Sequence, residues 1–480
     1  MPAFSSIEQY HAQLLEDQTT CRQAVEHYLQ CIHDSAQLNA FIEVYADEAM
    51  QQATLLDEKR KNGSPIGKLH GVVIALKDVL CHKDHKVSAS SNILKNFTSV
   101  YSATAVEKLL AEEAIIIGRT NCDEFAMGST NENSAYGKVL NALDETRVPG
   151  GSSGGSAVAV QAGLCMISLG SDTGGSVRQP ADFCGIVGLK PTYGRISRYG
   201  LIAYASSFDQ IGIFGNNVAD VAKTLEVISG PDEYDSTVSQ KQVPAYFSEL
   251  AVQKKFRFAF LEEALNHRSL DPEIATAIKN LTEQLKKDGH TIEPVKFDLL
   301  DHIVPAYYVL TTAEASSNLS RYDGVRYGYR TPELNTDLTE FYKQTRSTGF
   351  GKEVQRRIML GTFVLSAGYY DAYFTRAQKV RRLLSDKTRE IFNSFDFILL
   401  PTSPVTAFKA GEKMNDPVSM YLADIYTVMA NLVGIPAISL PLFKHSNNMP
   451  FGLQVMANRF DELTLLQVSG LMMNRYRKTD

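Results

Sequence analysis

Short, largely apolar runs alternate with amphipathic segments along most of the chain. Runs at 72–76, 115–119, 256–261, 397–400, 437–440 and 452–456 have the length and composition of buried strands. The segments 103–113, 272–288 and 371–392 repeat their apolar positions every three or four residues, as amphipathic helices do. This alternation of strands and helices predicts an α/β protein built around a β-sheet.

The N-terminal part of the chain has a helical pattern instead. Residues 5–61 are predicted to be helical, and 20–23 has the sequence of a capping box that begins with Thr20. The apolar face of the helix that follows consists of Ala24, Val25, Tyr28, Leu29 and Ile32. We expect this region to pack against the sheet. Near the other end, 421–425 is predicted to lead into a helix, and a further helix follows the last strand.

A lysine stands at the end of the first predicted strand. The apolar run 72–76 lies within the stretch 69–78, and Lys77 follows the run directly. Burying a lysine is costly, because the apolar interior disfavours the charged amine and lowers its pKa. Lys77 is therefore either a surface residue just past the strand or a buried group with a chemical role.

Two glycine-rich loops follow each other in the middle of the chain. They read Pro149-Gly-Gly-Ser-Ser-Gly-Gly-Ser156 and Gly170-Ser-Asp-Thr-Gly-Gly-Ser176. Between them, 157–164 is predicted to be a buried helix and 165–169 a buried strand, so both loops should meet at one edge of the sheet. The successive amides of the second loop predict an oxyanion-binding nest, with Ser176 at its end where a nucleophile belongs.

Three other motifs in this region fit less well. Ser153 matches the Gly-x-Ser-x-Gly nucleophile elbow, but that elbow follows a strand and 144–149 is a poor strand. The triplet that begins at Asp172 is the kind found in aspartic proteases, whose mechanism needs a second carboxylate, and the sequence has no second triplet. No segment fits the phosphate-binding pattern Gly-x-x-x-x-Gly-Lys-Ser/Thr.

Composition limits the class of protein. The 480 residues are 44% hydrophobic and 21% charged, which allows a large core, and the net charge of −6 argues against a broad nucleic-acid-binding face. Six cysteines without a Cys-x-x-Cys pair predict reduced thiols. No basic segment followed by an apolar one stands at the N-terminus, and no apolar run has the length of a membrane span. We therefore expect a cytoplasmic protein.

The segment 81–85, Cys-His-Lys-Asp-His, contains residue types that bind zinc. It has no second pair of ligands further along the chain, which zinc sites usually have. We predict an exposed loop here and no metal in this chain.

The glycine-rich stretch, together with the strand that ends at Lys77, resembles the signature of the amidase signature family. That resemblance implies a mixed central β-sheet covered by helices on both faces (α/β/α). It also implies a Ser-Ser-Lys triad with Ser176 as nucleophile, Ser152 as bridging serine after a cis peptide bond, and Lys77 as base. The remaining residues implied are Thr173, Gly174 and Gly175, with the amide of Ser176, for the oxyanion hole, and Met127, Gly128 and Ser129 beside the acyl group.

The region 307–371 narrows the resemblance to family members that hydrolyse glutamine within tRNA-dependent amidotransferases. In these proteins an arginine and an aspartate hold the α-carboxylate and α-ammonium of glutamine, and the matching positions are Arg357 and Asp424. Arg356 is the alternative to Arg357, and Tyr307 or Tyr308 would line the same pocket. The pairing suits the substrate, because a guanidinium matches a carboxylate and an acidic group matches an ammonium.

One domain over 1–480 is expected, because no linker-like run divides the chain. Its parts are an N-terminal helical segment (1–61), the catalytic signature core (69–215), an insertion with substrate-pocket helices (232–395), and C-terminal strands and a helix that return to the core (396–480).

The resemblance implies a glutaminase that supplies ammonia to a partner subunit within a heterotrimer. The partner would bind ATP and Mg²⁺ and most of Glu-tRNA(Gln), and this chain would carry no cofactor. Two alternatives stay open: a free-standing amidase that cleaves another small amide, and a scaffold subunit without catalytic activity.

Overall fold

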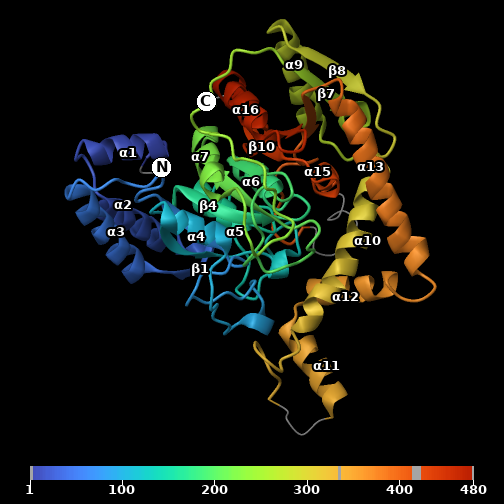
Figure 1. The fold of residues 1–480 in the computed structure, drawn as a ribbon. Helices are drawn as coiled ribbons and strands as arrows, with labels where there is room; N and C mark the ends of the chain where they lie inside the picture. Colours follow the sequence, from blue (N-terminus) through green and yellow to red (C-terminus); the bar gives the residue numbers. More distant parts are fainter. Residues whose placement is uncertain (1–3, 333–336, 413–422, 478–480) are drawn as a thin grey trace.

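The centre of the protein is one mixed β-sheet. The structure is a computed structural model that describes residues 4–332, 337–412 and 423–477 (Figure 1). In this part of the chain the sheet has eleven strands in the order β1-β3-β2-β4-β6-β5-β10-β11-β9-β7-β8. The strands are β1 (Phe41–Val44), β2 (Val73–Lys77), β3 (Ile115–Thr120), β4 (Ile167–Asp172), β5 (Val187–Lys190), β6 (Gln210–Gly215), β7 (Arg257–Leu261), β8 (Thr291–Val295), β9 (Phe397–Pro401), β10 (Ala437–Lys444) and β11 (Pro450–Ala457).

Parallel and antiparallel pairs occur in the same sheet. β2 lies between β3 and β4 and runs parallel to both, and β7 runs parallel to β8 and β9. The other neighbouring pairs are antiparallel. The prediction of a mixed sheet is therefore confirmed. Since the carboxyl ends of β2, β3 and β4 point the same way, residues that follow these strands are brought together.

The helices surround this sheet. Their bounds are α1 (Ile7–Leu15), α2 (Cys21–Asp34), α3 (Ala46–Lys61), α4 (Thr104–Ala111), α5 (Gly154–Gln161), α6 (Arg178–Cys184), α7 (Val218–Ile228), α8 (Glu262–Leu265), α9 (Pro272–Lys287), α10 (Leu300–Asn318), α11 (Leu338–Gly349), α12 (Lys352–Val364), α13 (Arg376–Phe392), α15 (Val428–Val433) and α16 (Glu462–Tyr476). In the ranges that the structure describes, no helix is long and apolar enough to cross a membrane.

Helices cover both faces of the sheet. On β6, a Cβ added at Gly212 would meet Val177, the residue before α6, whereas one added at Gly215 would meet Val221 of α7. Positions 212 and 215 point to opposite faces of a strand, so α6 and α7 lie on opposite sides. α5 packs against α6, and α16 packs against α7. The predicted α/β/α arrangement is thus confirmed.

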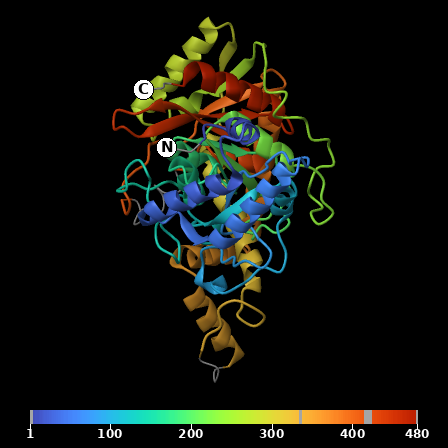
Figure 2. The ribbon, with the colours of Figure 1, turned by 90° about the vertical axis from the view of Figure 1, so that its left-hand side faces the viewer.

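A group of helices extends to one side of the sheet (Figure 1). α10 packs against α12 and α13. α11 lies at the far end of this group and projects away from the rest of the molecule in both views (Figures 1 and 2). α10 and α12 contain the tyrosine and arginine residues that are predicted to contact substrate.

Some predicted elements differ from those observed. Thr20 caps α2 by accepting a hydrogen bond from the amide of Gln23, as predicted. The expected continuous helical region 5–61 is wrong at 41–44, where β1 pairs with the edge of β3. The helix predicted at 157–164 begins three residues earlier, at Gly154, and the following strand is shifted to Ile167–Asp172. Part of the segment 421–425 lies outside the described residues, and α15 begins at Val428.

Candidate active site

The candidate site lies where three parallel strands end. Lys77 is the last residue of β2, and Asp172 is the last residue of β4. The loop after β3 contains Asp123, and the N-terminus of α5 follows Ser152 and Ser153. Both glycine-rich loops therefore reach the same edge of the sheet, as the sequence predicted.

Lys77 is completely buried and is surrounded by serine hydroxyls. Its Nζ lies 2.7 Å from Ser152 Oγ, 2.8 Å from Ser153 Oγ and 2.9 Å from Ser171 Oγ. Burial lowers the pKa of Lys77 from 10.5 to about 8. A substantial fraction of neutral amine, which is required of a base, is therefore present at mildly alkaline pH.

Ser152, the predicted bridging serine, is held in place through its neighbours. The Gly151–Ser152 peptide bond is cis. The amide of Gly151 donates to Gln179 Oε1 (3.0 Å), and the carbonyl of Ser152 accepts from the amide of Asp123 (3.0 Å). A Cβ at position 151 would lie 2.2 Å from Asp123 Oδ2 and 2.6 Å from the amide of Thr130, so only glycine fits there.

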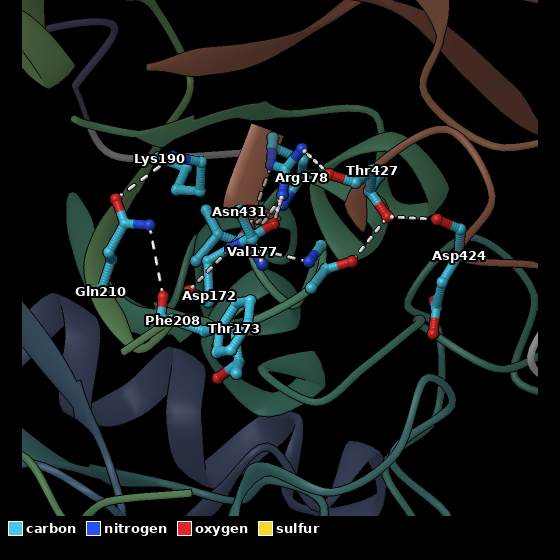
Figure 3. Close-up of polar contacts among 12 residues, drawn as sticks. Asp172, Thr173, Val177, Arg178, Lys190, Phe208, Gln210, Asp424, Thr427 and Asn431 are labelled. Atoms are coloured by element: carbon cyan, nitrogen blue, oxygen red, sulfur yellow. Dashed lines mark hydrogen bonds and ion pairs between the residues drawn. The ribbon is translucent and has the colours of Figure 1, made fainter. Parts of the chain in front are cut away.

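Asp172 organises the second loop. Its carboxylate accepts hydrogen bonds from the amides of Gly175 (2.8 Å) and Val177 (3.1 Å), and it pairs with Arg178 (2.9 Å) (Figure 3). Burial opposes ionisation of Asp172, but the adjacent Arg178 guanidinium outweighs it and holds the pKa of the carboxyl below its ordinary range. Asn431 also donates to Asp172 (2.9 Å).

These contacts correct one predicted role. The N–H of Gly175 is directed at Asp172, so it is not available as a donor of the oxyanion hole. The amides of Thr173, Gly174 and Ser176 make no hydrogen bond with any described residue. They are the donors that remain for an oxyanion.

Ser176 stands at the end of this loop and is 8% exposed. Its Oγ forms no hydrogen bond with Ser152 or with any other residue in the described ranges. The structure thus brings Lys77 and Ser152 together and leaves the side chain of Ser176 unengaged. Geometries of this kind often tighten only when substrate binds.

A second group of polar residues lies next to this loop and includes Asp424. Its carboxylate accepts hydrogen bonds from Ser129 Oγ (3.0 Å) and from the hydroxyl of Tyr308 (2.9 Å). Burial raises the pKa of Asp424 to about 6. Three residues later, Thr427 Oγ1 donates both to the carbonyl of Gly174 (2.7 Å) and to that of Asp424 (3.1 Å). This threonine links the Asp424 segment to the loop 172–176, the predicted nucleophile loop (Figure 3).

Arg357 belongs to the same group of residues and is 5% exposed. Its Nε donates to Glu353 (2.9 Å) and its Nη1 to the hydroxyl of Tyr204 (2.9 Å). The guanidinium also lies over the ring of Tyr308, 5.3 Å from the centroid. Arg356 has a side chain that is 53% exposed and pairs with Glu353 at the surface. The structure therefore favours Arg357 over Arg356 as a pocket residue.

Both predicted tyrosines line this region. Tyr308 joins Arg357 to Asp424, as described above. Tyr307 lies against the nucleophile loop, since a Cβ at Gly174 would be 2.3 Å from its hydroxyl. Met127 and Gly128 are beside Ser129, and a Cβ at Gly128 would meet the carboxylate of Asp123. All predicted site residues thus lie in one region, but their catalytic and binding roles stay predictions.

Several polar residues of the site were not found from the sequence. Ser153 was considered only as an elbow nucleophile, and Asp172 only as part of a protease triplet. Ser171 and Tyr204 were not singled out. The adjacency of Asp172 and Arg178 to the glycines was a usable signal, because a buried carboxylate beside glycines often accepts their amides.

The segment 81–85 is only partly the exposed loop that was predicted, because Lys83 and Asp84 are exposed whereas Cys81 and His82 are buried. Possible ligand atoms of Glu48, His82 and His85 lie within 4.8 Å of one another. However, the two imidazole rings are stacked 4.0 Å apart at 2°. Ring nitrogen lone pairs lie in the ring planes, so two stacked rings do not direct them at one ion.

Comparison with known proteins places the chain in a family. A family model described as Amidase matches residues 23–466. The A subunit of glutamyl-tRNA(Gln) amidotransferase from Chlorobium phaeobacteroides is 50% identical over 470 residues, which are 98% of this chain and 98% of the relative. The corresponding protein of Chlorobium luteolum is 51% identical, covering 97% of this chain and 96% of the relative.

A solved structure supports the same assignment. The crystal structure of the A subunit of glutamyl-tRNA(Gln) amidotransferase from Thermotoga maritima matches with a TM-score of 0.79 and 40% identity, over 96% of this chain and 93% of that chain. Similarity of this extent covers the sheet, the glycine-rich loops and the helices that carry Arg357 and Tyr308. The chain therefore belongs to the amidase signature family, and within it to the glutamyl-tRNA(Gln) amidotransferase A subunits.

Proposed function

We propose that this protein hydrolyses the side-chain amide of glutamine and supplies the ammonia to an amidotransferase. The observation that carries the proposal is the completely buried Lys77, whose amine contacts Ser152 directly beside the loop of Ser176. A buried lysine with a lowered pKa is a base, and a serine loop with free amides is an acyl-transfer site.

The reaction proceeds through an ester of Ser176. Neutral Lys77 takes the hydroxyl proton of Ser152, which takes that of Ser176, while Ser176 Oγ bonds to the carbonyl carbon of the substrate amide. Negative charge on the carbonyl oxygen is stabilised by the free amides of the loop. The C–N bond then breaks, and the proton held by Lys77 returns through Ser152 to the leaving nitrogen, which departs as ammonia. Water cleaves the ester and releases glutamate.

The substrate is recognised by opposite charges. Arg357 keeps guanidinium N–H groups beyond those used by Glu353 and Tyr204, and these suit an α-carboxylate. Asp424, with a pKa of about 6, is mostly ionised at neutral pH and suits an α-ammonium. Tyr308 contacts both residues and so sets their spacing. An uncharged small amide would offer no opposite charge to either residue and would leave the remaining N–H groups of Arg357 unused, which weakens its binding relative to glutamine.

The acceptor of the ammonia belongs to other chains. We propose a heterotrimer with the B and C subunits, in which the partner binds Glu-tRNA(Gln) and, with ATP and Mg²⁺, converts it to Gln-tRNA(Gln). The relatives carry this activity in their name, and the sequence of this chain has no phosphate-binding loop of its own.

Glutamate release tests the proposal. The chain is incubated with glutamine alone, and then with its partner subunits, charged tRNA and ATP. We expect glutamate release that rises with the partners and disappears in Ser176→Ala, although that variant still assembles. Preferential cleavage of propionamide over glutamine would instead support a free-standing amidase. Undiminished release by Ser176→Ala would remove Ser176 from the mechanism, and release in no condition would support a scaffold.

A further inference from the structure

The amine of Lys77 has three oxygen neighbours, but a neutral amine has only two N–H groups and one lone pair. Each neighbour must therefore either accept a proton from the amine or donate one to it. The hydroxyl that donates its proton to the amine faces the lone pair. The lone pair is therefore directed at Ser152 only if Ser152 is that donor.

The hydroxyl of Ser153 is already committed as a donor. It donates to the carbonyl of Ser171 at 3.1 Å, so towards Lys77 Nζ, 2.8 Å away, it can only accept. One N–H of the amine is thereby used. The second N–H and the lone pair are left for Ser152 and Ser171, whose hydroxyls form hydrogen bonds only with Lys77 among the described residues.

The reaction requires Ser152 to donate its proton to the lone pair. Ser171 must then accept the second N–H. We propose that Ser171, together with Ser153, is a positioning residue that accepts the N–H groups of neutral Lys77 and so directs its lone pair at Ser152. This inference deepens the proposed function, because it rests on Lys77 acting as the base.

Loss of the Ser171 hydroxyl has a distinctive consequence. The ammonium form of Lys77 has three N–H groups and would find only two acceptors. It therefore loses more hydrogen-bond stabilisation than the neutral form does. The neutral amine would also turn an N–H towards Ser152, which points its lone pair away. We therefore expect both a lower pKa for Lys77 and a slower reaction.

Other ionisable groups face the same lysine and set the background of the titration. They are Cys122 and Asp123 after β3, Asp172 at the end of β4 and Asp209 before β6. None of them forms a hydrogen bond with Lys77 Nζ in the described ranges. A change at Ser171 leaves all four groups in place, so a shift in the pKa of Lys77 can be assigned to the lost hydroxyl.

The experiment compares Ser171→Thr with Ser171→Val in the complete complex. The two new side chains have the same shape and differ in the hydroxyl, which separates hydrogen bonding from packing. Ser168→Ala is the control, because Ser168 is a buried serine of the same strand whose hydroxyl donates to the carbonyl of Ala75 (3.2 Å) instead. Glutamine hydrolysis is followed between pH 6 and 10.

In Ser171→Val we expect the acidic limb of the kcat/KM profile to shift to lower pH by about one unit. The shift arises because the charged amine loses more hydrogen-bond energy than the neutral amine does. The plateau of kcat should fall about tenfold. Ser171→Thr should keep both near their native values, and the Ser168 variant should resemble the native chain. Equal profiles for the threonine and valine variants would overturn the proposal.

A second measurement does not depend on turnover. The ¹³C shift of the lysine ε-methylene, assigned to Lys77 by comparison with Lys77→Met, reports its titration directly. It should show the same lowering of the pKa in Ser171→Val, and an unchanged pKa would overturn the role of Ser171. If the native complex does not hydrolyse glutamine, the proposed function fails, while this titration still decides whether Ser171 holds the amine.

Discussion

Replacement of Asp172 by asparagine is the sharpest test of how the nucleophile loop is held. The carboxylate accepts from the amides of Gly175 and Val177, from Asn431 and from two nitrogens of Arg178. Both Asp172 and Arg178 have completely buried side chains. The Asp172→Asn change would remove the charge opposite the guanidinium. In either orientation the new amide would also place an NH₂ group against N–H donors.

The expected loss of stability is large. Removing one partner of a buried ion pair costs about 3–5 kcal/mol, because the other charge is left without compensation. That is a large part of the roughly 5–15 kcal/mol that typically separates folded from unfolded proteins. Activity should fall about a hundredfold or more, which is the usual effect of displacing an oxyanion-hole donor.

Urea unfolding followed by circular dichroism measures the first effect, and glutamate release by the assembled complex measures the second. Asp386→Asn is the control, because Asp386 is paired with Arg382 at the surface and its change should be undetectable. Arg178→Met should be destabilising by itself, and the double variant should lose less than the sum of the two. A loss below about 1 kcal/mol in Asp172→Asn, or strictly additive losses, would refute the reasoning, since a buried pair is strongly coupled.

Three further changes test the site. Lys77 must be neutral to act as the base, and its pKa is lowered to about 8. We therefore expect kcat/KM for glutamine to fall about tenfold per pH unit below pH 8 and to level off above it. A profile that is flat from pH 6 to 9 would contradict the assignment of Lys77 as the base. Arg357→Lys and Asp424→Asn should each raise KM for glutamine about tenfold or more, because each loses a charged hydrogen bond to the substrate. Arg356→Lys should leave KM unchanged when glutamate release is measured at increasing glutamine concentration. Gly151→Ala should abolish activity and lower the thermal midpoint, because its Cβ would lie 2.2 Å from Asp123 Oδ2, whereas Gly470→Ala, with no atom within 4 Å, should do neither.

Sequence patterns predicted the sheet better than its edges. β2, β3 and β9 are buried apolar runs, and each was located to within a residue or two. β1 was missed because its four residues are half-buried and lie within helical neighbours, so only pairing with β3 reveals the strand. The start of α5 was also misplaced, because the helix begins with two glycines and glycine has a low helix propensity.

The candidate site was predictable where a residue type is unusual and not where it is common. A lysine after a buried run is rare, and so is a tandem of glycine–serine loops, so Lys77 and Ser176 stood out. Ser152 was reached only through the resemblance to the amidase signature family. Ser171 and Ser153 are ordinary serines in the sequence, and only the distances to Lys77 Nζ distinguish them. Gly175 shows the converse case, because the sequence cannot tell that its amide is directed at a carboxylate.

Burial explains why the amine of Lys77 becomes neutral at moderate pH although acidic groups surround it. Burial raises the pKa of Asp123 to about 6 and that of Asp209 to about 7, so both carboxyls are still largely ionised near pH 8, where Lys77 titrates. Asp172 stays ionised, but Arg178 balances its charge at 2.9 Å. The lysine therefore faces negative charge that favours its ammonium form, and desolvation by burial outweighs that charge and lowers its pKa to about 8. Arg178 thus offsets part of the negative charge that favours the ammonium form of Lys77, in addition to pairing with the carboxylate that holds the loop.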